Sequence, residues 1–192
     1  MSRAHLILAS ASPRRKELLA LTGLSFEVKP SRVDESLISG EAPRNYVLRL
    51  AKDKAEWQAD KNRGAWILAA DTIVTLNNSV IGKPQHKKEA VEMIRALSGR
   101  CHEVLTGYYL LNRDLGECGR GLSSTEVEFR TLTNREIEDY VDSGESLGKA
   151  GAYAIQGLGA TLVTRVNGSY TNVIGLPLAE IIELMKRFEL II

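Results

Sequence analysis

The chain has 192 residues, of which 44% are apolar and 26% are charged, and its formal net charge is +1. These values are typical of a soluble globular protein, and we expect residues 1–192 to form a single domain with two lobes. The near-zero charge excludes a general attraction to nucleic acid or acidic membranes, so that any anion site must be local.

The first half of the chain begins with an expected strand over residues 5–9 and a helix over residues 13–21, which Ser12 caps. Arg14 and Arg15 lie in the first turn of this helix, where the helix dipole disfavours cations. Two guanidinium groups beside exposed backbone N–H groups suit an anion such as phosphate. The alternative is a solvated basic helix start.

Two further charged positions follow in a polar loop and a helix. Residues 30–40 form the expected loop and carry the adjacent acids Asp34 and Glu35, which are either surface charges or ligands for a hard divalent cation. The helix over residues 43–60 has an apolar stripe, and Lys54 falls on it. Lys54 therefore either extends out of the core to solvent or points into a cleft that the stripe borders.

The most apolar stretch, residues 65–74, predicts a strand that is buried on both faces and is interrupted by Asp71. A buried carboxylate is costly unless a partner or a metal compensates it. The alternative is that Asp71 ends the strand and caps the next element. Asn77-Asn78 predicts a tight hairpin in which residues 79–81 return, followed by Lys83.

The remaining elements complete an α/β pattern. We expect a strand over 25–28, a helix over 85–97, strands over 102–111 and 122–130 that pair across a polar loop over 112–121, a capping-box helix over 133–143, a glycine-rich loop over 144–159, a strand over 161–166 and a helix over 178–188. Strand–helix alternation followed by a long hairpin indicates a mixed, twisted sheet.

Several functional patterns are excluded. Gly144 to Gly148 matches a nucleophile elbow by letter, but a helix precedes it and no histidine comes after it. The three histidines are scattered, and Cys101 and Cys118 fit no metal spacing. So few thiols favour a reducing compartment. No secretory signal, membrane span or basic–aromatic stripe is recognisable, so we expect a cytoplasmic protein without membrane or nucleic-acid partners.

A set of cations and acids remains: Arg14, Arg15, Lys54 and Lys83 with Glu35 and Asp71. This set suits phosphoanhydride chemistry, because cations hold a polyphosphate, carboxylates hold a divalent metal, and one carboxylate can orient or deprotonate water. Spacing alone does not show that these groups converge.

Five motifs in order resemble the Maf family of nucleotide pyrophosphatases, and together they extend over essentially the whole chain. They are SASPRRKELL (10–19), ADTIV (70–74), GKP (82–84), KAGAYAIQG (149–157), and NGSY (167–170) with GLP (175–177). The resemblance implies a bent mixed sheet flanked by helices, with two lobes around a central cleft, as in the related inosine triphosphate pyrophosphatases. It also implies metal-assisted hydrolysis of a nucleoside triphosphate substrate, with Mg²⁺ or Mn²⁺.

The resemblance assigns roles residue by residue. It implies a catalytic set of Asp71, Glu35, Lys54 and Lys83, metal ligation by Glu35 and Asp71, and substrate binding by Ser10, Ser12, Arg14, Arg15, Thr72 and Gln156. Arg14, Thr72 and Gln156 are the residues of the branch that acts on dTTP and UTP. A sister branch prefers 7-methyl-GTP and differs at these positions. Ala154 replaces a glycine of some relatives, which is a small change.

We therefore predict a pyrophosphatase that acts on dTTP and UTP and removes non-purine or modified nucleotides. The alternatives are a 7-methyl-GTP pyrophosphatase and, from another class, a regulatory binding protein that acts on septum formation. The intact acid–base set argues against a purely binding role. The oligomeric state is left open, a homodimer included. Asp71→Asn should remove most turnover and leave the fold intact. If Asp71 has no partner, the variant should also melt at a higher temperature, because an unpaired buried carboxylate costs stability.

Overall fold

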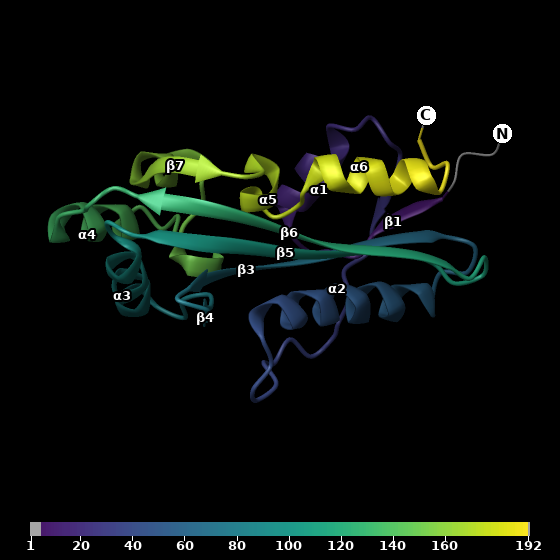
Figure 1. The fold of residues 1–192 in the computed structure, drawn as a ribbon, viewed down its shortest axis with the longest axis horizontal. Helices are drawn as coiled ribbons and strands as arrows, with labels where there is room; N and C mark the ends of the chain where they lie inside the picture. Colours follow the sequence, from purple (N-terminus) through teal and green to yellow (C-terminus); the bar gives the residue numbers. More distant parts are fainter. Residues whose placement is uncertain (1–4, 192) are drawn as a thin grey trace. The chain divides into compact units, whose positions relative to one another are not determined.

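A computed structural model describes residues 5–191 as a mixed α/β fold (Figure 1). The strands are β1 (Leu6–Leu8), β2 (Glu27–Val28), β3 (Trp66–Leu76), β4 (Ser79–Ile81), β5 (Cys101–Asn112), β6 (Glu117–Phe129) and β7 (Val163–Asn167). They pair in the order β2-β1-β3-β5-β6-β7, and β4 pairs with β3. Because β1 is parallel to β2 and β3 while β4 and β7 are antiparallel to their neighbours, the predicted mixed sheet is confirmed.

The helices are α1 (Pro13–Ala20), α2 (Pro43–Ala59), α3 (Lys87–Leu97), α4 (Asn134–Asp142), α5 (Tyr170–Ile174) and α6 (Leu178–Arg187), with 3₁₀ segments η1 (Ala150–Ala152) and η2 (Gly157–Leu162). The chain divides into two compact units. Unit 1 contains the chain up to Asp71, Thr106–Ser123, and the chain from Gly175 onward; unit 2 contains Thr72–Leu105 and Ser124–Ile174. The chain passes from unit 1 to unit 2 inside β3, between Asp71 and Thr72.

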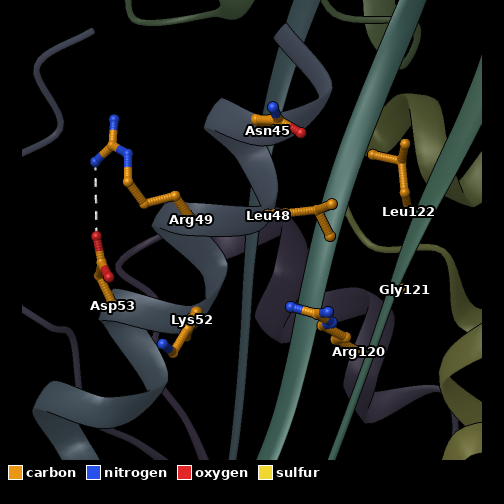
Figure 2. A pocket seen from close by; sticks show the side chains of 8 residues that line it. All are labelled: Asn45, Leu48, Arg49, Lys52, Asp53, Arg120, Gly121 and Leu122. Carbon is orange, nitrogen blue, oxygen red and sulfur yellow. Dashed lines mark ion pairs between the residues drawn. The ribbon is translucent and has the colours of Figure 1, made fainter. Parts of the chain in front are cut away.

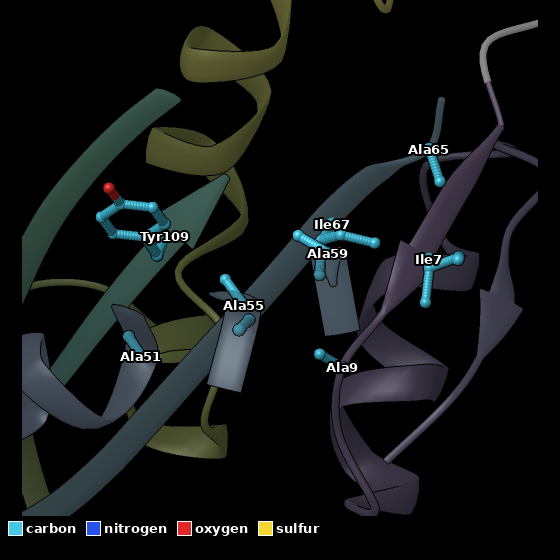
Figure 3. Close-up of a cluster of buried hydrophobic side chains, with 9 residues drawn as sticks. Ile7, Ala9, Ala51, Ala55, Ala59, Ala65, Ile67 and Tyr109 are labelled. Atoms are coloured by element: carbon cyan, nitrogen blue, oxygen red, sulfur yellow. The ribbon is translucent and has the colours of Figure 1, made fainter. Parts of the chain in front are cut away.

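The core of unit 1 places α2 very close to the strands. Three alanines one turn apart on this helix, Ala51, Ala55 and Ala59, belong to a buried cluster with residues of β1, β3 and β5 (Figure 3). Their small side chains let the helix backbone approach the sheet. The backbones are in contact at Gly107 of β5, where a Cβ atom would collide with the carbonyl group of Val47. Only glycine fits there without movement of α2.

The opposite face of these strands is covered by the C-terminal helix. Side chains alternate along a strand, so Trp66 of β3 points away from its neighbour Ile67, which faces α2. The Trp66 ring lies 4.8 Å from the ring of Phe188, centroid to centroid, just after α6. A Cβ atom on Gly119 of β6 would collide with Leu184 of α6. Unit 1 therefore has a helix layer on each side of its strands.

Unit 2 confirms two local predictions. Asn77 and Asn78 adopt positive φ angles of 50° and 62°, and the hairpin pairs Val74 with Ile81. In α4 the Thr133 hydroxyl oxygen accepts from the backbone N–H of Glu136, whose carboxylate accepts from the Thr133 N–H, so the capping box is present. Helices α3 and α4 pack against each other.

Two predictions about the second half were wrong in detail, and one helix was missed. The expected loop over 112–121 is only the turn between Asn112 and Glu117, because the Asn112 side-chain oxygen accepts from the N–H groups of Asp114 and Leu115 and closes the turn early. The strand expected from residue 161 begins at Val163, after η2. Helix α5 was not predicted, because five residues are too few for a periodic signal.

None of the helices in the described chain is both long and apolar enough to cross a membrane.

Candidate functional site

Unit 1 contains a buried lysine that is paired with two acids. The Nζ atom of Lys54, on α2, donates to Oδ1 of Asp71 at 2.7 Å and lies 2.7 Å from Oε1 of Glu35. Lys54 and Asp71 are each only 7% exposed, whereas Glu35 is half exposed on the loop before α2. Lys54 therefore does not extend to solvent. Asp71 lies within β3, so the alternative that it ends the strand was wrong.

The ion pair changes one expectation about stability. The expected rise in melting temperature for Asp71→Asn depends on Asp71 being a buried carboxylate without a partner. Because Asp71 shares the Lys54 ammonium with Glu35, its removal breaks a charge-assisted hydrogen bond. The condition for a higher melting temperature is therefore not met, and with this geometry we expect Asp71→Asn to lower the melting temperature.

The start of α1 arranges two serines and two arginines. The Ser12 hydroxyl caps the helix by accepting from the backbone N–H of Arg15 at 3.4 Å. The Ser10 hydroxyl oxygen accepts from the backbone N–H of Ser12 at 3.1 Å and from Nη1 of Arg15 at 3.4 Å. Since both bonds use its lone pairs, Ser10 keeps its own hydroxyl proton as a donor.

Arg15 also connects α1 to the last chain segment of unit 1, which starts at Gly175. Its Nε donates to the carbonyl oxygen of Gly175 at 2.8 Å, across 160 residues of sequence. Burial lowers the pKa of the Arg15 guanidinium and the charge of Arg14 adds to this shift, whereas the charges of Asp71 and Glu35 oppose it. Asp71 and Glu35 are therefore close enough to Arg15 to interact with it electrostatically.

Sequence reasoning missed two side chains that hold the loop of Glu35. The Tyr46 hydroxyl donates to the carbonyl oxygen of Glu35 at 2.7 Å, and Nη2 of Arg49 donates to the carbonyl oxygen of Ser36 at 3.1 Å. Both residues lie on α2, three positions apart, and so share a helix face. Burial, followed by the charges of Asp71 and Glu35, raises the pKa of Tyr46, so the phenol stays protonated as a donor.

The other predicted residues, Thr72, Lys83 and Gln156, belong to unit 2. The hairpin register, continued two residues beyond β4, places Lys83 level with Thr72. The backbone N–H of Gly151 donates to the carbonyl oxygen of Gly82 at 3.0 Å, so the GKP and KAGAYAIQG segments lie side by side. Gln156 is exposed on the loop after η1.

Aromatic residues hold that loop from within unit 2. His102 Nε2 and the Tyr153 hydroxyl are 2.8 Å apart, and both rings make edge contacts with Phe129. His102 is only 3% exposed, and burial lowers its pKa to about 4. Burial likewise raises the pKa of Tyr153. The pair is therefore neutral at physiological pH.

This neutral histidine predicts an acid-sensitive fold. The unfolded chain binds a proton at His102 near its ordinary value of 6.5, whereas the folded chain does so only near 4, so stability should fall as the pH drops between these values. The full loss is about 3 kcal/mol, since one pKa unit corresponds to about 1.4 kcal/mol. Urea unfolding of wild type and His102→Gln from pH 7 to 4 measures it. Equal pH dependence of the two proteins would contradict the prediction.

Two acids of unit 1 suit a divalent metal ion only together with further ligands. No group of three or more His, Cys, Asp and Glu side chains within residues 5–191 could hold a metal ion. However, one oxygen of Glu35 and one of Asp71 converge on the same ammonium group. Mg²⁺ typically uses one or two carboxylates together with water and substrate phosphates. The two carboxylates suit that donor set.

A separate pocket in unit 1 lies between α2 and β6 (Figure 2). It is lined by Asn45, Leu48, Arg49, Lys52, Asp53, Arg120, Gly121 and Leu122. Arg49 is already paired with Glu41 at 2.7 Å and with Asp53 at 3.6 Å, which compensates part of the basic charge. None of the residues predicted for the site lines this pocket.

Comparison with known proteins agrees with the arrangement of motifs. The family model described as Maf-like protein matches residues 5–188. A dTTP/UTP pyrophosphatase of Geobacter sulfurreducens is 47% identical over 97% of this chain and 98% of its own length. A dTTP/UTP pyrophosphatase of Anaeromyxobacter dehalogenans strain 2CP-C is 50% identical over 95% and 93%, respectively. With this family match over nearly the whole chain, the protein belongs to the Maf family.

Proposed function

We propose that this protein hydrolyses dTTP and UTP to the nucleoside monophosphate and pyrophosphate. The observation that carries the proposal is the ion-paired group of Lys54, Asp71 and Glu35, in which a buried carboxylate lies inside a strand; this supports Asp71 as the proton acceptor. The choice of substrate rests on the curated relatives, which are named dTTP/UTP pyrophosphatases.

In the proposed reaction, the oxygen of a water molecule bonds to the α-phosphorus while the bond from that phosphorus to the α–β bridging oxygen breaks. Pyrophosphate leaves with the bridging oxygen, and Asp71 accepts the proton of the water. Lys54 holds Asp71 and Glu35 in place. The hydroxyl of Ser10, the cap at Ser12 and the guanidinium groups of Arg14 and Arg15 provide donors for phosphate oxygens at the start of α1.

A divalent metal, Mg²⁺ or Mn²⁺, would be held by Glu35 and Asp71 and would supply neutralisation of the phosphate charge. In unit 2, Lys83 is the proposed cation for the triphosphate, and Thr72 and Gln156 are the proposed contacts for the nucleoside. An amide offers one donor group and one acceptor, which suits the paired N–H and C=O edge of uracil and thymine.

A nucleotide panel tests the proposal directly. The purified protein with Mg²⁺ or Mn²⁺ is given dTTP, UTP, CTP, ATP, GTP and 7-methyl-GTP, and pyrophosphate is measured separately from orthophosphate. The expected result is pyrophosphate release that is fastest from dTTP and UTP. Turnover of 7-methyl-GTP that is faster than that of dTTP and UTP would overturn the substrate assignment. Nucleotide binding without hydrolysis would indicate the regulatory alternative.

A further inference from the structure

Glu145 follows the C-terminal end of α4 in unit 2, and its carboxylate is hydrogen-bonded to the loop that carries Gln156. Its Oε2 accepts from the backbone N–H of Leu158 at 2.9 Å, and its Oε1 accepts from the backbone N–H of Gly159 at 2.8 Å. Both donors lie within three residues of Gln156. One half-buried carboxylate therefore satisfies two backbone groups on the C-terminal side of the proposed base-reading residue.

The same carboxylate reaches the N-terminal side of Gln156 through a tyrosine. The Tyr140 hydroxyl donates to Oε1 of Glu145 at 3.2 Å and accepts from the backbone N–H of Ala154 at 3.3 Å. Gln156 is thus bracketed by Ala154 and Leu158, whose backbones are both tied to Glu145, one directly and one through Tyr140.

The glycines on either side of Leu158 show how tightly the loop surrounds this carboxylate. A Cβ atom on Gly157, which has a φ of +74°, would collide with Oε2 of Glu145. A Cβ atom on Gly159 would collide with the carbonyl oxygen of Ala154 and lie 3.1 Å from Oε1 of Glu145. A side chain at either place would require movement of Glu145 or of the loop backbone, so the loop packs closely around this carboxylate.

We infer that Glu145 is a positioning residue for Gln156 and that it sets the preference for uracil-type over cytosine-type bases. The inference rests on the proposed function, because it requires that Gln156 contacts the base. A side-chain amide discriminates between bases only if its donor and acceptor are held within a fraction of an ångström. Gln156 is exposed, and the backbone on both sides of it is hydrogen-bonded to Glu145 or, through Ala154, to Tyr140.

The test uses Glu145→Gln, which keeps the shape but replaces one acceptor oxygen with an NH₂ group that faces a backbone N–H. The kcat/KM ratio of UTP to CTP should fall about tenfold in this variant, as in Gln156→Ala. In the Gln156→Ala background, Glu145→Gln should change the ratio no further, since residues that act through each other are not additive. Glu138→Gln, an exposed substitution on α4, is the matched control and should keep the wild-type ratio.

The outcomes separate this inference from the proposed function. If Gln156→Ala lowers the ratio and Glu145→Gln does not, Glu145 only stabilises the loop. The inference is then wrong, while the proposed function is unaffected. An unchanged ratio in Gln156→Ala would overturn both the role of Gln156 and that of Glu145. Hydrogen–deuterium exchange provides a second measurement that needs no activity. Exchange at Leu158 and Gly159 should be faster in Glu145→Gln, and unaltered exchange would overturn the inference.

Discussion

Asp71→Asn is expected to lower kcat for UTP by a factor of about 10²–10⁴, because the amide cannot accept the proton of the attacking water. The free energy of unfolding should also fall, by about 1.5–3 kcal/mol, because Lys54 loses a charge-assisted hydrogen bond. Glu35 remains beside the ammonium, so the fold should persist. Steady-state kinetics and urea unfolding of the same preparation measure both effects.

Asp114→Asn is the matched control, because Asp114 is bonded to Arg63 and to the backbone N–H of Gly64 outside the proposed site. It should keep the wild-type kcat. If Asp71→Asn retains more than about a tenth of wild-type turnover, Asp71 is not the general base. A melting temperature above that of the wild type would contradict the pairing of Asp71 with Lys54.

Lys54→Met is expected to have the largest effect on stability. The substitution leaves the buried carboxylate of Asp71 beside that of Glu35 with no ammonium between them. Removing one partner of a buried ion pair costs about 3–5 kcal/mol. Turnover should fall below detection, because the two acids repel each other and leave their positions. Thermal and urea unfolding at neutral pH check the loss of stability.

Two further variants make the Lys54 result specific. Lys52→Met, two residues earlier on α2, removes an exposed lysine that pairs only at 3.6 Å with Glu56, and it should change the unfolding free energy by well under 1 kcal/mol. The double variant Lys54→Met with Asp71→Asn leaves no unpaired charge in the strand, so it should recover part of the stability without recovering activity. A double variant that is no more stable than Lys54→Met would show that packing, not charge, governs this position.

The parts of the fold that could be predicted from sequence are those with a local physical cause. The hairpin at Asn77-Asn78 follows from the tolerance of asparagine for positive φ, and the start of α4 follows from the capping box at Thr133. The turn after Asn112 was misplaced for the opposite reason. The segment after the turn is polar and suggests a loop, but pairing with β5 makes it a strand from Glu117 onward.

The candidate site was predictable where a residue broke the pattern around it. Asp71 interrupts an apolar strand and Lys54 interrupts an apolar helix stripe, so each signalled a buried charge. That the two meet could not be predicted, because pairing between α2 and β3 is set by packing of the alanines rather than by any local pattern. Glu145 carried a signal that was overlooked. It lies in a glycine-rich segment, and a lone acid there can accept from many exposed backbone N–H groups.

The bond from Arg15 to the carbonyl oxygen of Gly175 has a consequence for synthesis on the ribosome. The first segment of unit 1 is synthesised before unit 2. Its final segment starts at Gly175 and is synthesised after every residue of unit 2, so unit 1 is completed last. A nascent chain that stalls before this point already holds Lys54 and Asp71 but lacks the acceptor for Arg15 and the helix that covers Trp66. Unit 1 therefore completes its core only after the chain from Gly175 onward has been made.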